Sequence, residues 1–358
     1  MYSLFSTKPV LESILKTGEK SKWYLVLQRT NIREIFIPEE FVPNVDNPMG
    51  PQDELSVINQ YIPITPRTKH LEYCKQRKKD EFIECVKKLT NALFLVDGSF
   101  DNTDLKYISE EMGIYCCRFS EADEGLFNPI KSYSLKKGEK DFSWTSFFTS
   151  LNRFPTKSAI ICDRNIFSND YQIGCKNLQS ILDNLIISGR CTNYSFAVLF
   201  EKFSDDHQEQ VNEQKKKDIL KNLKEYLWQK ILHGGLPIIN VKIDLVSVSR
   251  TNPYFEITHD RVIYCDYYTV GATHAISALN KDGYSLKTQA ISHSALFSSV
   301  GSGVSDIIQQ RKNVFPDYRK IFEEDVGLNC YRITGEGYSE ILASECLNDC
   351  RILVDATV

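Results

Sequence analysis

The chain has 358 residues, of which 42% are hydrophobic and 25% charged, and its formal net charge is −4. These values are typical of a globular protein with an ample core. The slightly acidic balance argues against a protein that coats nucleic acid with a broad basic face. No apolar run approaches the length of a transmembrane helix, and the first residues lack the apolar stretch of a secretion signal, so we expect a cytoplasmic location.

The 11 cysteines are scattered along the chain. They form no Cys-x-x-Cys pair and no cluster with histidine at the spacing of a zinc site. This pattern indicates reduced thiols in the core. We therefore expect neither a metal nor a cofactor.

Residues 1–90 are predicted to form an N-terminal β-containing extension of unknown role. Within residues 22–41, the runs WYLVLQ and EIFIP are rich in strand-forming residues and predict two strands. His70 to Leu89 predicts a helix with a lysine-rich face. Because acidic residues are interspersed, we interpret that face as solvated, although a phosphate-binding stripe is the alternative.

From Asn91 onward, strands alternate with helices. Predicted strands are the apolar runs ALFLVDG, GIYCCRF, SFAVLFEKF and PIINVKIDLVSVS. Predicted helices cover residues 104–112, 177–188 and 206–232. Strands separated by helices of this length indicate an α/β sandwich, so residues 91–358 are predicted to form one α/β core.

Two segments of this core resemble each other without a gap, residues 161–177 (ICDRNIFSNDYQIGCKN) and residues 258–274 (THDRVIYCDYYTVGATH). The identical positions are Asp163/Asp260, Arg164/Arg261, Ile166/Ile263, Tyr171/Tyr268 and Gly174/Gly271. Such a block predicts a duplicated unit, in which each copy begins with a strand and folds back. The first copy is therefore expected to place a second short strand at Tyr171 to Cys175.

The polar residues of the two segments suit phosphate chemistry. Residues two apart on a strand face the same side, so His259 and Arg261 project together, as do Cys162 and Arg164. Arginine binds phosphate oxygens, and histidine can attack phosphorus or move a proton. We expect the fold-back to bring a further set of side chains to these positions: Asp266, Asn169, His274 and Asn177.

This pattern resembles the phospholipase D superfamily, in which a motif HxKxxxxD, followed by a GSxN-like element, occurs twice per active site. The second copy here reads His259-x-Arg261-xxxx-Asp266, then Gly271 to His274. The first reads Cys162-x-Arg164-xxxx-Asn169, then Gly174 to Asn177. The tripeptide HDR, His259 to Arg261, also resembles the motif of a degenerate branch of this superfamily. That branch includes the C-terminal domain of microtubule-interacting-and-trafficking proteins.

The resemblance implies duplicated phospholipase D-like α/β sandwich lobes, with a phosphate site between the repeats at 161–177 and 258–274. Arginine replaces the family's lysine in both copies, and Cys162 stands where the family has one of its two catalytic histidines. The resemblance therefore implies phosphate binding by Arg164, Arg261, Asn177, Asn169 and His274, with catalytic roles for His259, Asp266 and Cys162 if turnover is retained.

Three functional hypotheses follow. In the first, the protein binds a phosphate-bearing ligand, nucleic acid or a phospholipid headgroup, without hydrolysing it. In the second, it is a metal-independent phosphodiesterase or nuclease with His259 as nucleophile. In the third, it is a structural module that binds a protein partner in a larger assembly, with Arg164 and Arg261 neutralised by Asp163 and Asp260. Composition and pattern leave the oligomeric state open.

Overall fold

A computed structural model describes residues 2–24, 32–37, 64–66, 92–111, 113–121, 126–127, 131–151, 154–168, 170–187, 193–203, 209–233, 240–298 and 307–354. The chain divides into two compact units, residues 1–129 with 295–312, and residues 130–294 with 313–357. The predicted lysine-rich helix at residues 70–89 lies outside the described residues. None of the helices in the described part of the chain has the length and apolar character needed to cross a bilayer.

The first unit contains a five-stranded sheet in the order β3-β2-β1-β4-β5, with every neighbouring pair parallel. Its strands are β1 (Tyr2–Ser6), β2 (Ile32–Ile37), β3 (Ile64–Pro66), β4 (Ala92–Val96) and β5 (Tyr115–Arg118). Its helices include α1 (Lys8–Thr17), the turn η1 (Gly18–Lys20), and α6 (Asn102–Lys106), which runs into η3 (Tyr107–Glu111). A further turn, η4 (Phe119–Glu121), follows β5.

The predicted strand ALFLVDG is confirmed as β4, whose five residues are all buried. The run EIFIP is confirmed as part of β2. Trp23, by contrast, lies in a helical turn, so the strand predicted at its position is wrong there. The predicted boundary near residue 90 falls inside this unit, because β1 pairs with β4 and Phe5 stacks on Phe94 at 4.4 Å.

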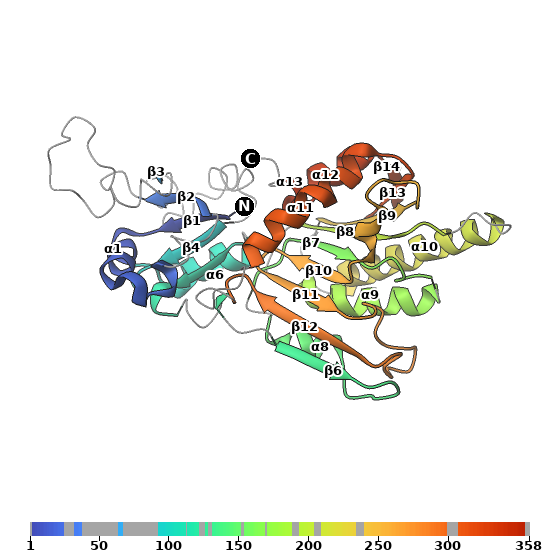
Figure 1. The fold of residues 1–358 in the computed structure, drawn as a ribbon, viewed down its shortest axis with the longest axis horizontal. Coiled ribbons are helices and arrows are strands. Elements are labelled where there is room, and N and C mark those ends of the chain that lie inside the picture. Colours follow the sequence, from blue (N-terminus) through green and yellow to red (C-terminus); the bar gives the residue numbers. More distant parts are fainter. Residues whose placement is uncertain are drawn as a thin grey trace. The chain divides into compact units, whose positions relative to one another are not determined.

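The second unit is built on a nine-stranded mixed sheet in the order β14-β13-β9-β8-β7-β10-β11-β12-β6 (Figure 1). Its strands are β6 (Lys131–Leu135), β7 (Ser158–Cys162), β8 (Asn193–Glu201), β9 (Asn240–Val248), β10 (Val262–Cys265), β11 (Tyr268–Ala272), β12 (Gln289–Ala295), β13 (Leu328–Ile333) and β14 (Tyr338–Ile341). Strands β7, β8 and β9 are parallel, whereas β10 runs antiparallel to β7.

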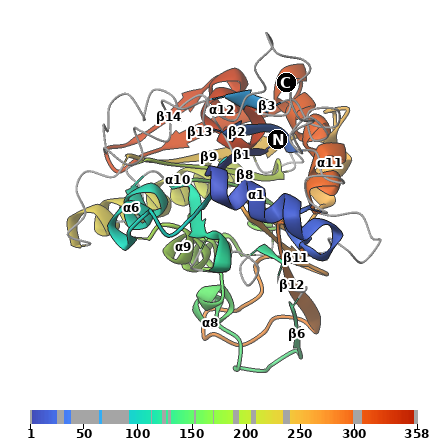
Figure 2. The ribbon, with the colours of Figure 1, turned by 90° about the vertical axis from the view of Figure 1, so that its left-hand side faces the viewer.

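Helices cover both faces of this sheet. They are α8 (Trp144–Thr149), α9 (Tyr171–Leu185), α10 (Glu209–His233), η5 (Phe255–His259), α11 (Ile307–Glu324), α12 (Ala343–Asp349) and α13 (Arg351–Val354). Figure 2 shows α9 and α10 on one side of β8 and β9, with α12 on the other. On the α12 side, Cys162 of β7 and Val246 of β9 pack with Tyr318 and Cys346 in one apolar cluster. The α/β class is thus confirmed.

The two similar segments take different forms. Residues 158–162 form β7, and after a turn the chain enters α9 at Tyr171, so the short strand predicted at Tyr171 to Cys175 is wrong. Asp170 caps that helix, accepting hydrogen bonds from the amides of Gln172 and Ile173. Residues 262–272 instead form the antiparallel pair β10–β11. Both segments belong to one sheet, and the described residues do not form two equivalent lobes.

Candidate functional site

The pairing of β7 with β10 brings the two Asp-Arg dipeptides to one edge of the sheet. Cys162, the last residue of β7, is paired with Val262, the first residue of β10. Arg164 follows β7 and Arg261 precedes β10, so these arginines leave the sheet at the same edge. The amide of Arg164 also donates to the carbonyl of Thr258 at 2.9 Å, which ties the two segments together.

Arg164 contacts His259 directly. Its Nη1 lies 3.0 Å from Nδ1 of the imidazole and also contacts Nε2. A guanidinium can only donate, so the imidazole nitrogen that takes this hydrogen bond is the acceptor, and the tautomer of His259 decides which of the two it is. Nε2 lies 3.3 Å from a carboxylate oxygen of Glu256, an exposed side chain to which it can donate. His259 is therefore oriented by an arginine of the other segment.

Arg261 lies beside Asp163, a fully buried carboxylate. Asp163 accepts from the amide of Ile276 at 2.7 Å and from that of Asn165 at 3.0 Å. Burial raises the pKa of Asp163, while these amides and the charge of Arg261 act in the opposite direction. Arg261 itself makes a long contact of 3.5 Å from Nη1 to the carbonyl of Thr273.

Both guanidinium groups retain unused hydrogen-bonding capacity. The Nε atoms of Arg164 and Arg261 are buried and have no acceptor among the described residues. In the same part of the chain, no carboxylate lies within the 4.0 Å ion-pair distance of either arginine. Asp260 instead accepts from the hydroxyl of Tyr318 at 3.2 Å. Burial of part of the carboxylate raises the pKa of Asp260, while the hydrogen bond from Tyr318 acts in the opposite direction, although the residue as a whole is exposed.

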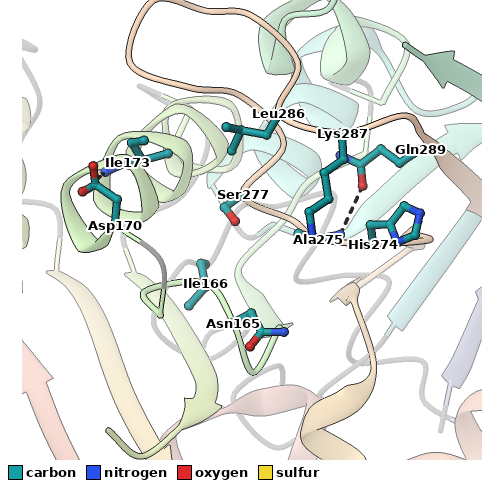
Figure 3. Close-up of a pocket in the computed structure, with 10 residues that line it drawn as sticks. All are labelled: Asn165, Ile166, Asp170, Ile173, His274, Ala275, Ser277, Leu286, Lys287 and Gln289. Atoms are coloured by element: carbon teal, nitrogen blue, oxygen red, sulfur yellow. Dashed lines mark hydrogen bonds between the residues drawn. The ribbon is translucent and has the colours of Figure 1, made fainter. Parts of the chain in front are cut away.

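A cavity of about 170 Å³ opens at this edge of the sheet (Figure 3). One wall comes from the turn after β7 and the first turn of α9, with Asn165, Ile166 and Asp170. The other comes from the chain after β11 and the start of β12, with His274, Lys287 and Gln289 among its residues. Gln289 accepts from the amide of Ala275 at 3.1 Å, which fixes this wall beside His274.

Cys162 lies at the same edge but is completely buried. Its thiol is 3.5 Å from the carbonyl of Ile257. Burial raises the pKa of the Cys162 thiol far above its ordinary value, so the thiolate needed for attack does not form near neutral pH. The structure thus contradicts a catalytic role for Cys162.

Asp266 lies at the opposite end of β10 from His259. It is fully buried and accepts from the amides of Lys157 at 2.7 Å and Ser158 at 3.0 Å, at the start of β7. The strand separates this carboxylate from the imidazole that it was expected to orient. Asp266 instead connects the end of β10 to the start of β7 through these two hydrogen bonds.

Asn177 is a structural residue, contrary to its predicted phosphate-binding role. Its amide nitrogen donates to the carbonyls of Ile173 and Leu279, and its oxygen accepts from Leu279 N and Trp144 Nε1. These bonds occupy the carboxamide on the buried side of α9. Asn169 lies outside the described residues. Of the predicted set, Arg164, His259, Arg261 and His274 therefore remain at the accessible edge.

Some contributors to this edge were not identified from the sequence. Lys287 and Gln289 line the cavity, and Tyr318 binds Asp260. Each comes from an element far along the chain, and no local motif marks it.

No family model matches the chain, and no curated protein matches it either.

Proposed function

We propose that the edge carrying Arg164, Arg261 and His274 binds a phosphate-bearing ligand without hydrolysing it. The ligand chemistry is a phosphodiester or phosphomonoester, as in nucleic acid or a phospholipid headgroup. The relation to the phospholipase D superfamily remains part of this proposal. It is supported by the convergence of two arginines from segments 97 residues apart in the sequence.

The observation that carries the proposal is the state of the two guanidinium groups. Each has a buried Nε–H without an acceptor among the described residues. Neither forms a close ion pair there, although the charge of Arg261 acts on Asp163. Buried donors in folded proteins are almost always satisfied, and an unsatisfied one costs about 1–3 kcal/mol. An oxyanion beside the two guanidinium groups accepts charge-assisted hydrogen bonds from them, and the cost falls where it also reaches Nε.

Binding without turnover is favoured by what surrounds His259. The superfamily resemblance implies two histidines with supporting carboxylates, whereas Cys162 is buried and Asp266 lies at the far end of β10. The guanidinium of Arg164 also contacts the imidazole of His259 through its ring nitrogens. General acid–base catalysis needs groups within hydrogen-bond reach of the substrate, and this edge lacks the expected pair.

The test compares Arg164→Ala and Arg261→Ala with Arg250→Ala. Arg250 follows β9, is 78% exposed and is paired with the Glu201 side chain at 2.7 Å. Its removal changes the net charge equally and deletes no atom of the backbone bond, 3.1 Å long, by which the Glu201 amide donates to the Arg164 carbonyl. Binding is measured for a single-stranded oligonucleotide, for vesicles containing phosphatidic acid and for inorganic phosphate. A charge-assisted hydrogen bond contributes about 1.5–3 kcal/mol, so each site variant should weaken binding roughly tenfold or more.

The three probes separate the sources of the phosphate, and Arg250→Ala should bind each as the wild type does. Equal affinities for all variants would refute the site. Hydrolysis of any probe in EDTA that disappears in His259→Ala would refute binding without turnover and favour the phosphodiesterase. Failure of all three probes to bind the wild-type protein would favour the partner-binding module.

A further inference from the structure

A second cavity, of about 240 Å³, lies in the second unit between α10 and the nine-stranded sheet. Its residues come from the ends of β8 and β9, from β13, and from the first half of α10. β8 and β9 are parallel, so the cavity lies at their carboxyl ends, the place where ligands bind in open α/β sheets. None of its lining residues belongs to the arginine site.

The floor of this cavity is unusually polar for a sheet face beneath a helix. Ser247 of β9 is paired with Asn329 of β13, and Leu245 is paired with Tyr331, which places these four side chains on one face. Ser247 is buried, and its hydroxyl makes only a long contact of 3.4 Å with the carbonyl of Asn329. Within the described residues, the carboxamide of Asn329 has no hydrogen-bond partner. Packing alone would favour apolar side chains here.

A cationic rim borders the polar floor. Nζ of Lys216 donates to Glu213 at 2.8 Å and to the hydroxyl of Tyr331 at 3.0 Å, and it lies 4.9 Å from the centre of that ring. An ammonium has three donors, so Lys216 keeps one for a ligand, and the Tyr331 hydroxyl keeps its own proton to donate. Lys202 also lines the cavity. The ammonium of Lys216 and the hydroxyl of Tyr331 therefore give this rim donors that suit a negatively charged ligand.

The remaining wall is apolar and aromatic. Phe200 and Phe203 lie 6.0 Å apart between ring centres, and Ile219 and Leu220 of α10 also line the cavity. Phe200 is held from behind by an edge-to-face contact with Phe167 at 5.0 Å. Aromatic walls of this kind stack on planar ligands, and they do so whichever base is present.

We propose that this cavity binds a nucleoside monophosphate, a planar nitrogen heterocycle that carries a negative charge. The base lies against Phe203 and Phe200 and exchanges hydrogen bonds with the Asn329 carboxamide, which has both a donor and an acceptor. The phosphate lies at the rim, where Lys216 and Tyr331 donate to it. The inference uses residues distinct from those of the proposed phosphate edge and stands independently of it.

The test is calorimetric titration of the full chain with AMP, GMP, CMP and UMP, with adenosine and inorganic phosphate as partial ligands. At least one monophosphate should bind. Adenosine and inorganic phosphate should each bind about tenfold or more weakly than the best monophosphate, because each lacks half of the contacts. Asn329→Ala and Tyr331→Phe should each weaken monophosphate binding about tenfold. Tyr331→Phe removes only a hydroxyl, so it serves if the alanine variant fails to fold.

Because the arginine edge is itself proposed to bind phosphomonoesters, every titration is repeated in Arg261→Ala. Monophosphate binding that persists in Arg261→Ala and is weakened by Asn329→Ala belongs to this cavity. No binding by any monophosphate would overturn the proposal. It would also be overturned if Asn329→Ala and Tyr331→Phe both retained wild-type affinity, or if Arg261→Ala abolished binding. The last result would move the ligand to the arginine edge, so the two proposals fail in distinguishable ways.

Discussion

The two glycines that occupy the same position in the similar segments should respond in opposite ways to alanine. Gly174 lies inside α9, where a Cβ atom would stand 2.1 Å from the carbonyl oxygen of Ile166 and 2.9 Å from a ring carbon of Phe167. Favourable contacts between heavy atoms lie near 3.5–4.0 Å, so backbone would have to move by more than about 1 Å. Gly271 lies on β11, and a Cβ there would meet only Ser292 Oγ, at 3.8 Å.

The magnitudes follow from these distances. Overpacking costs about 1–3 kcal/mol, and a 2.1 Å approach to a backbone oxygen belongs to the upper part of that range, about 2–3 kcal/mol. Alanine recovers about 1 kcal/mol of helix propensity, so Gly174→Ala should lower the free energy of unfolding by about 1–2 kcal/mol. Gly271→Ala meets no obstacle and should be neutral or stabilising by about 0.4–1 kcal/mol, through reduced freedom of the unfolded chain. The two variants should therefore differ by roughly 1.5–3 kcal/mol, the sum of the two effects.

Urea unfolding followed by circular dichroism measures both variants against the wild type. Because the chain has two compact units, the transition should be recorded with a second probe, such as tryptophan fluorescence, before a single free energy is assigned. Equal midpoints for the two variants would refute the reasoning, since true structural equivalence of the segments predicts one shared response. A Gly174→Ala protein as stable as the wild type would refute the close approach to Ile166.

Three further predictions concern buried polar groups. Asn177→Ala should lower the free energy of unfolding by about 2–3 kcal/mol in urea titrations, because it leaves polar groups of Leu279 and Trp144 unpaired. A change below about 0.5 kcal/mol would show that the hydrogen bonds of the Asn177 carboxamide are not needed for stability. Burial raises the pKa of Asp163, so the native state binds the proton more tightly than the unfolded chain does. The contribution of Asp163 to stability is therefore greatest below the ordinary aspartate pKa and falls as pH rises through the raised value, and Asp163→Asn should flatten this part of the stability–pH curve; a curve of unchanged slope would contradict it. Iodoacetamide should spare Cys162 in the native protein and modify it in urea, as read by mass spectrometry, because that thiol is buried with a raised pKa; rapid native-state modification would show that the edge opens.

The sequence predicted the buried strands of the second unit well. β7, β8 and β9 are apolar runs between helices, and their composition alone indicates strands packed on both faces. Strands with little burial were missed or misread. Four of the five residues of β6 and three of the four residues of β14 are exposed, so neither strand carries an apolar run that would mark it.

The similarity of the two segments indicated which residues lie near each other in the sheet, but it predicted the wrong secondary structure for the first segment. It drew attention to Arg164 and Arg261, which flank the paired ends of β7 and β10. It also favoured a strand at Tyr171, although Asp170 is a good helix cap and the apolar residues that follow have helical spacing. The roles of Asn177 and Asp266 depend on partners more than 100 residues away in the chain, and no local pattern indicates such contacts.

Because β7 pairs with β10, ligand binding by both Arg164 and Arg261 can report whether the sheet has folded correctly. Four residue pairs, from Cys162–Val262 to Ala159–Cys265, fix how far each strand extends toward the edge. A slip of one residue would turn the side chains of β10 to the other face and shift Arg261 away from Arg164. A ligand that needs both arginines would bind only chains in which β7 and β10 pair in the native register. It would therefore stabilise those chains and increase their share during refolding. Affinity for that ligand would then report the fraction of chains whose strands have paired in the native alignment.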